Sequence, residues 1–204
     1  VPGIRAEVIA NGVDVDYFRP GGAQQTAGNL VMASGMNWFP NKDAVLYMCD
    51  EIWPRLCARM PGLTWTVVGS SPPPRLLDLA ATDSRVTVTG FVDDVRPYLD
   101  RAEIYLCPMR DGGGTRLKIL DALSMAKAIV STTMGCEGID VTPGVDVLLA
   151  DTADEFVEQV ARLRSDVGLH QRIAKAAREL AIRRYSWDVI GNQLATVYRS
   201  LTAA

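Results

Sequence analysis

The sequence predicts an α/β protein with a Rossmann-like, doubly wound parallel sheet of about six strands. Two observations lead to this prediction. From Leu30 onward, short apolar runs alternate with longer segments of helical periodicity, which is typical of a parallel sheet covered by helices on both faces. The length of 204 residues is enough for one domain with one sizeable core. We therefore expect a single domain over residues 1–204.

The expected strands are the short apolar runs at 30–36, 64–70, 85–91, 103–109, 128–133 and 147–150. Helices are expected to begin near Lys42, Pro73, Asp94 and Thr115, and three more to fill the C-terminal quarter at 152–166, 168–183 and 187–201. The polar, glycine-rich stretch 21–29 follows an N-terminal segment of little periodicity, so we expect a surface loop there. Because the chain begins with Val1 rather than Met, we expect an excised piece of a longer protein.

Composition argues against several function classes. Charged residues make up 22% of the chain and the formal net charge is -3, opposite in sign to that of a nucleic-acid binder. The four cysteines lie far apart without metal-ligand spacing, so we expect buried, reduced thiols and no metal site. No apolar run approaches the ~20 residues of a membrane span and no signal-peptide pattern is visible, so a cytoplasmic location is expected. The single histidine, His170, is expected to be a surface or capping residue, because no Ser/His/Asp or Cys/His set can be assembled.

The segments that follow the strands are the expected site of function. In an open, doubly wound sheet, ligands bind in the crevice beyond the carboxyl ends of the strands. The first expected strand ends near Gly35, the second near Gly69, and the third runs into Val92. We therefore expect these three positions to contact a ligand, whereas Trp38 and Phe39 are expected to be packing residues.

The most informative segment follows the fourth expected strand and consists of Gly112, Gly113, Gly114 and Thr115. Bare backbone N–H groups next to a helix N-terminus attract phosphate, and glycine allows the backbone to approach a ligand closely. Arg110 and Lys118 add positive charge on either side. The alternative interpretation is a flexible connector. The spacing differs from the dinucleotide and P-loop motifs, which argues against a simple NAD or ATP-hydrolase function.

Two further side chains are candidates for ligand contact. Asp121 lies in the helix after the glycine loop, where a carboxylate can accept hydrogen bonds from ribose hydroxyls. Lys42 lies where a cation can reach a diphosphate across the crevice. The alternatives are a solvated helix acid for Asp121 and an ordinary surface lysine for Lys42.

Four segments together resemble a known family. They are "IANGVDVDYFRP" (9–20), "SGMNWFPNKDA" (34–44), "VTGFVDDVRPYLDRAEIYLCPMRDGGGTRLKILDALSMAKAIVSTTMGCEGID" (88–140) and "YSWD" (185–188). They resemble the C-terminal, donor-binding domain of retaining GT-B glycosyltransferases, of the "family 4" type that builds bacterial surface polysaccharides and glycolipids. The likeness covers nearly the whole chain. It implies that this half of a GT-B fold binds a UDP- or GDP-sugar, without a cofactor or a metal, while an absent N-terminal half binds a saccharide or lipid acceptor.

The resemblance also implies residue roles. Gly112, Gly113, Gly114 and Thr115 match the loop near the donor diphosphate and sugar. Lys42 matches a phosphate-binding lysine, Val92 lies where backbone groups meet the base, and Asp121 matches the second of two family glutamates, which binds the ribose. Two departures are clear. Gly113 occupies the position of the first glutamate, and Met36 replaces an arginine, so donor use is expected to differ.

Cleavage of a sugar–diphosphate bond requires stabilisation of the negative charge on the leaving phosphates, to which the helix N-terminus at Thr115 can contribute. Lys42, Arg110 and Lys118 are the candidate groups, and we expect Arg110 or Arg116 to replace the charge lost at Met36. The helix 187–201 is expected to pack on the missing domain, and the whole enzyme is expected to contact the inner face of the membrane peripherally. Alternatives that stay open are a nucleotide-sugar 2-epimerase, a non-catalytic nucleotide-sugar-binding module, and a doubly wound domain of other function.

Overall fold

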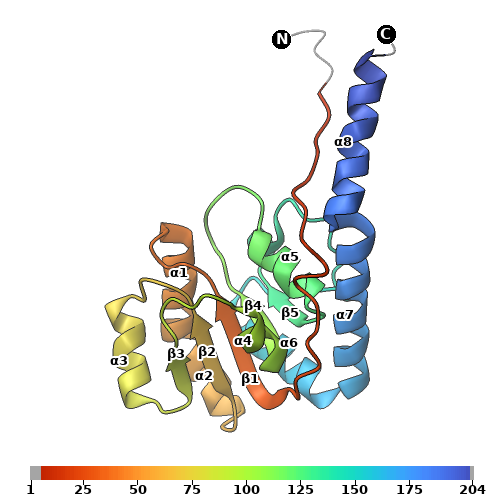
Figure 1. Ribbon diagram of the computed structural model, residues 1–204. Coiled ribbons are helices and arrows are strands. Elements are labelled where there is room, and N and C mark those ends of the chain that lie inside the picture. Colours follow the sequence, from red (N-terminus) through yellow and green to blue (C-terminus); the bar gives the residue numbers. More distant parts are fainter. Residues whose placement is uncertain (1–5, 203–204) are drawn as a thin grey trace.

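The computed structural model describes residues 6–202, which form a six-stranded, all-parallel sheet flanked by helices (Figure 1). The strands lie in the order β3-β2-β1-β4-β5-β6. Their bounds are β1 (Thr26–Ala33), β2 (Thr64–Val68), β3 (Val86–Val88), β4 (Ala102–Cys107), β5 (Ala128–Ser131) and β6 (Leu148–Leu149). The predicted fold class is confirmed. The predicted limits at residues 1 and 204, and the start at Val1, lie outside the described residues.

The helices cover both faces of the sheet. They are α1 (Phe39–Tyr47), the π-helical turn η1 (Met48–Ile52), α2 (Trp53–Arg59), α3 (Pro74–Thr82), α4 (Arg96–Arg101), α5 (Leu117–Ser124), the 3₁₀ turn η2 (Met134–Cys136), α6 (Ala153–Ser165), α7 (Val167–Leu180), the π-helical turn η3 (Ala181–Tyr185) and α8 (Trp187–Thr202). On one face α1 packs on α3 and α2 on α6, while on the other α5 packs on α7. The strands that follow β1 are added toward one edge of the sheet, and those that follow β4 are added toward the other edge. Because the crossover connections are right-handed, the helices of these two halves lie on opposite faces of the sheet.

The core lies on both sides of the central strands. Consecutive residues Leu30 and Val31 of β1 are both fully buried, as is Ile104 of the neighbouring β4. Because both faces are covered, the strands appear in the sequence as continuous apolar runs. The cysteines are free thiols, of which Cys57 alone is half-buried rather than buried.

The first strand begins earlier than the sequence predicts. The stretch 21–29 was expected to be a loop, but β1 starts at Thr26, which pairs with Ala102 of β4. The Gly28 N–H donates to the carboxylate of Glu103, so a partner strand fixes this polar segment as extended backbone. Local composition is overridden here by pairing with a strand far away in the sequence.

The N-terminal segment runs along α7 and α8 (Figure 1). The Val13 N–H donates to the Tyr185 carbonyl at 2.7 Å, and the Arg178 guanidinium donates to the carbonyls of Val15 at 2.8 Å and Phe18 at 2.9 Å. Three backbone contacts therefore tie this segment to the C-terminal helices. Of the helices in residues 6–202, none is both long enough and apolar enough to cross a bilayer.

Candidate functional site

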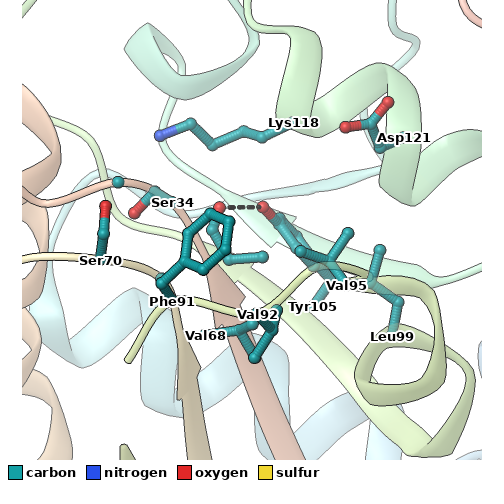
Figure 2. A pocket seen from close by; sticks show the side chains of 13 residues that line it. Ser34, Val68, Ser70, Phe91, Val92, Val95, Leu99, Tyr105, Lys118 and Asp121 are labelled. Atoms are coloured by element: carbon teal, nitrogen blue, oxygen red, sulfur yellow. Dashed lines mark hydrogen bonds between the residues drawn. The ribbon is translucent and has the colours of Figure 1, made fainter. Parts of the chain in front are cut away.

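A cavity of about 260 Å³ opens at the carboxyl ends of the central strands (Figure 2). From β1 the chain builds β2 and β3 on one side and then returns to place β4 on the other side, so the crevice between β1 and β4 is the topological switch point. Ligands of doubly wound sheets bind at this point. The cavity is lined by Ala33, Ser34, Gly35, Val68, Gly69, Ser70, Phe91, Val92, Val95, Leu99, Tyr105, Lys118 and Asp121.

Five of the residues predicted from the sequence line this cavity: Gly35, Gly69, Val92, Lys118 and Asp121. They come from three different strand ends and from α5, which the fold brings together. The other predicted residues lie outside the lining: Lys42, Arg110, Gly112, Gly113, Gly114 and Thr115.

The floor of the cavity depends on a close approach of the loops after β1 and β2. Gly69 has φ +147°, and a Cβ there would lie 1.9 Å from the Ser34 carbonyl oxygen, so only glycine fits. The Ser34 N–H donates to the Val68 carbonyl at 2.9 Å, and the Gly69 N–H donates to the Gly90 carbonyl at 3.0 Å. These bonds join the first three strand ends into one preformed edge.

Asp121 presents a carboxyl group to the cavity from α5 (Figure 2). Burial raises its pKa to about 7, and no neighbouring charge is among the causes of the shift. A carboxyl group in this setting can accept hydrogen bonds from ligand hydroxyls, and it does so most strongly when ionised.

Lys118 lies one turn before Asp121 on the same helix and extends over the cavity (Figure 2). Its ammonium group donates a hydrogen bond to Oδ1 of Asn41 at the start of α1. Burial, the largest cause, and the positive charge of Arg116 lower the pKa of Lys118. The described ion pairs of residues 6–202 give this lysine no carboxylate partner. The site therefore holds a cation without a carboxylate partner among the described residues.

The two arginines beside the glycine loop are engaged in the structure. Arg116 is only 2% exposed and donates to the carbonyls of Gly112 at 2.7 Å and Met134 at 3.1 Å. Arg110 forms a two-bond ion pair with Asp43, at 2.7 and 3.1 Å. The expectation that Arg110 or Arg116 replaces the charge lost at Met36 stays a prediction, and in this structure both guanidinium groups already have protein partners.

The glycine loop packs against the start of α1 rather than lining the cavity. Gly112 has φ +103°, and a Cβ there would lie 2.9 Å from the Pro40 ring. Gly113 has open space around it, and Thr115 is exposed. The next helix, α5, begins at Leu117, two residues later than expected. Lys42 is exposed on α1, at the same end of the sheet.

Several lining residues were not predicted from the sequence, namely Ser34, Ser70, Phe91 and Tyr105. Ser34 and Ser70 neighbour the predicted glycines, so their position after the strands was a usable signal. Trp38 and Phe39 were expected to pack, but they are 46% and 64% exposed at the start of α1, where the next two residues, Pro40 and Asn41, are the buried ones.

The amino-acid sequence is similar to that of known proteins. The family profile described as "Glycosyl transferases group 1" matches residues 27–166. The phosphatidyl-myo-inositol mannosyltransferase of Mycobacterium tuberculosis (strain ATCC 25618 / H37Rv) is 26% identical over 219 residues, which cover 99% of this chain and 56% of that protein. The chain thus spans about half the length of the curated relatives it matches.

Solved structures show the same fold. Anabaena HepE, crystallised in complex with UDP, has a TM-score of 0.76 and 17% identity, covering 95% of this chain and 57% of HepE. The C-terminal domain of the Francisella tularensis glycosyl transferase group 1 family protein LpcC has a TM-score of 0.67 and 17% identity, covering 86% of this chain and 100% of that domain. The structures establish the fold, and the profile match over more than half of the chain establishes the family. This chain belongs to the family of glycosyl transferases group 1.

Proposed function

We propose that this chain binds the nucleotide diphosphate sugar donor of a glycosyltransferase in the cavity between β1 and β4. The observation that carries the proposal is the pair Lys118 and Asp121, one helical turn apart on α5 and facing the same cavity at the switch point. An ammonium group suits a diphosphate and a carboxylate suits ribose hydroxyls. One helix face therefore offers both groups that a nucleoside diphosphate needs.

The proposed donor lies with its base between the loops after β2 and β3, where Gly69 and Val92 offer backbone groups and Phe91 offers an aromatic ring. Asp121 binds the ribose, and Lys118 stabilises the negative charge that develops on the leaving diphosphate. Lys42 and the loop Gly112 to Thr115 lie at the same end of the sheet, outside the cavity, and we assign the sugar to them. No metal or other cofactor is part of this proposal.

The other half of the active site belongs to a segment outside this chain. Apolar side chains are exposed at the carboxyl end of the sheet, where Phe91 is 75% exposed, and along α8, where Trp187, Leu194 and Tyr198 are exposed. Exposed apolar surface of this kind marks a contact with another domain. The match of LpcC's C-terminal domain over its full length supports placing this chain in the C-terminal half of a longer enzyme.

The acceptor is proposed to be a saccharide or a lipid-linked molecule that the N-terminal half holds at the inner face of the membrane. The M. tuberculosis relative, named for phosphatidyl-myo-inositol, supports a lipid acceptor. Retention of configuration at the sugar is proposed from the resemblance to retaining GT-B enzymes. The named relatives are glycosyltransferases, so no observation favours the 2-epimerase or the non-catalytic module.

Calorimetric titration of the chain with UDP, GDP, ADP and their sugar conjugates tests donor binding. We expect one base to be preferred and Asp121→Ala to weaken that nucleotide about tenfold, because a charged hydrogen bond to the ribose is lost. Asp154→Ala is the matched control, since Asp154 is an exposed acid at the start of α6 outside the cavity. Gly113→Val is expected to weaken only the sugar conjugate.

Absence of binding by all three nucleotides at millimolar concentration would overturn the proposal. The full-length protein with the preferred donor then separates the function classes. Transfer to an acceptor supports the glycosyltransferase, inversion at the sugar's second carbon supports the epimerase, and an intact donor supports a binding module.

A further inference from the structure

Asn41 is a buried polar residue at the edge of the cavity, and it joins three elements. It is 9% exposed and lies in the first turn of α1. Its Nδ2 donates to the Gly35 carbonyl at 2.7 Å, and its Oδ1 accepts from the Lys118 ammonium. Because the carbonyl needs a donor and the ammonium needs an acceptor, the orientation of the amide is fixed by its two partners. The side chain thus links the loop after β1 to the cation on α5.

The partner of Lys118 differs from the partners of the neighbouring cations. Arg110 faces the carboxylate of Asp43 at 2.7 Å, and Arg116 faces that of Glu137 at 3.3 Å. Lys118 faces an amide, which carries no net charge. The lowered pKa of Lys118, caused first by burial, agrees with an ammonium group that no carboxylate compensates.

An amide can orient an ammonium group without neutralising it. An ammonium group has three donors, and the amide takes one of them. A carboxylate of the same size would form an ion pair with Lys118, so that an arriving phosphate would meet a neutral pair. The choice between Asn and Asp at this position therefore decides how much positive charge the cavity offers.

We propose that Asn41 is a positioning residue, which holds Lys118 uncompensated and directed at the diphosphate of the nucleotide donor. The proposal rests on the proposed function, because it names a further residue of the same site. It also explains how the site provides positive charge although Met36 is buried in the core and the guanidinium of Arg116 is bound to carbonyls of the glycine loop.

The test compares Asn41→Asp and Asn41→Ala with the wild-type chain. The probes are the nucleoside diphosphate that the wild type prefers among UDP, GDP and ADP, and its parent nucleoside, each titrated calorimetrically. Asn41→Asp is expected to weaken the diphosphate about tenfold or more, since the ion pair competes with the phosphate. Asn41→Ala is expected to weaken it less, because Lys118 loses its orientation but keeps its charge. Both variants are expected to bind the nucleoside within about twofold of the wild type.

The order of the two variants separates charge from packing. If Asn41 served only to fill space, Asp, which has nearly the same shape, would bind the diphosphate better than Ala. Three results would overturn the inference. The first is tighter diphosphate binding by Asn41→Asp than by Asn41→Ala, the second is an equal loss of affinity for nucleoside and diphosphate, and the third is unchanged diphosphate binding by Asn41→Asp. If Asn41→Asp does not fold, as thermal unfolding would show, Lys118→Gln keeps a donor for Asn41 without the charge and must show the same selective loss. If the wild type binds the nucleoside diphosphate no more tightly than the nucleoside, the inference alone is overturned. If the wild type binds neither of them, the proposed function is overturned as well.

Discussion

Two helices, α5 and α6, begin at the same edge of the parallel sheet, and they begin in opposite ways. At the start of α6, Thr152 Oγ1 accepts from the Glu155 N–H at 3.3 Å, and the Glu155 carboxylate accepts from the Thr152 N–H at 2.9 Å. This capping box satisfies the free N–H groups with the helix's own side chains. At α5, Arg116 stands at the N-cap without a side-chain cap, and the first turn contains Lys118 and no acid.

We propose that this difference separates a helix end that binds a ligand from one that is only structural. The acids Asp154 and Glu155 complement the dipole of α6, so its N-terminus has little left to offer a ligand. The N-terminal end of α5 combines an open first turn with a cation beside the switch-point cavity. A ligand that carries negative charge is the partner that we propose for this end.

The largest expected effect is on stability, and it distinguishes Gly69, in the loop after β2, from Gly113, in the glycine loop before α5. Gly69→Ala is expected to lower the free energy of unfolding by about 3 kcal/mol, because the new Cβ meets the Ser34 carbonyl in a strained backbone conformation. Gly113→Ala is the matched control and is expected to leave the unfolding free energy within about 0.5 kcal/mol, since nothing lies near its Cβ. Urea unfolding measures both. Similar losses in the two variants would contradict the assignment of Gly69 to the cavity floor.

The second effect tests the uncapped N-terminus of α5 directly. Lys118→Met is expected to weaken binding of the preferred nucleoside diphosphate tenfold to a hundredfold, by about 1.4–2.7 kcal/mol, because the cation facing the phosphates is gone. Thermal stability is expected not to fall, since a partly buried charge without a carboxylate partner is removed. Lys175→Met on α7, a surface lysine paired with Glu179, serves as the control and should bind like the wild type.

The third effect tests the capped N-terminus of α6. Thr152→Ala is expected to lower the free energy of unfolding by about 1 kcal/mol, because the N-cap hydrogen bond of α6 is lost. Nucleotide affinity by calorimetry is expected to stay unchanged. If Thr152→Ala lost nucleotide affinity and Asp121→Ala did not, the roles assigned to α5 and α6 would be reversed.

The smallest expected effect is the pH dependence from Asp121. Its pKa in the folded chain is about 7. Since the ionised carboxylate forms the stronger hydrogen bond, affinity for the nucleoside should rise about fivefold as the pH increases through 7, and Asp121→Asn should abolish the rise. Calorimetric titration between pH 6 and 8 measures it, and a flat profile in the wild type would contradict the role of Asp121 at the ribose.

The stability of the chain should change in the opposite direction. A raised pKa means that the folded state keeps a proton that the unfolded state, with a pKa of 3.8, has released. Stability conferred by this proton is therefore lost as the pH rises from about 4 to about 7. Thermal unfolding of Asp121→Asn between about pH 4 and pH 7 should lack this fall in stability. An identical dependence of stability on pH in the wild type and the variant would indicate that the Asp121 carboxyl group is exposed to solvent.

The sequence predicts the strands, their parallel arrangement and the edge at which the site lies, because apolar periodicity and strand ends are local features. Gly35, Gly69 and Val92 line the cavity for this reason, whereas Lys118 and Asp121 were predicted from their place beside and after the glycine loop. The same signal places Lys42 and Thr115 only near the site. Their orientation depends on how α1 and the glycine loop pack, which no local pattern contains.

Arg116 and Lys118 show most clearly what the sequence leaves open. Both are cations two residues apart, but Arg116 is the N-cap residue with a non-helical backbone and Lys118 lies in the first turn of α5. The fold decides which one faces the cavity, and it buries Arg116 beneath the loop. The contact of Lys118 with Asn41 joins residues 77 positions apart, so it could not be predicted from spacing.

We propose that the uncapped N-terminus of α5, rather than the capped N-terminus of α6, receives a nucleoside diphosphate. Chemical-shift mapping of the ¹⁵N-labelled chain during titration with UDP, GDP and ADP tests it most directly. We expect one of them to shift the amides of Gly35, Gly69, Lys118 and Asp121 while those of Thr152 and Glu155 stay in place. Shifts centred on Thr152, or none with any of the three nucleotides, would contradict the account.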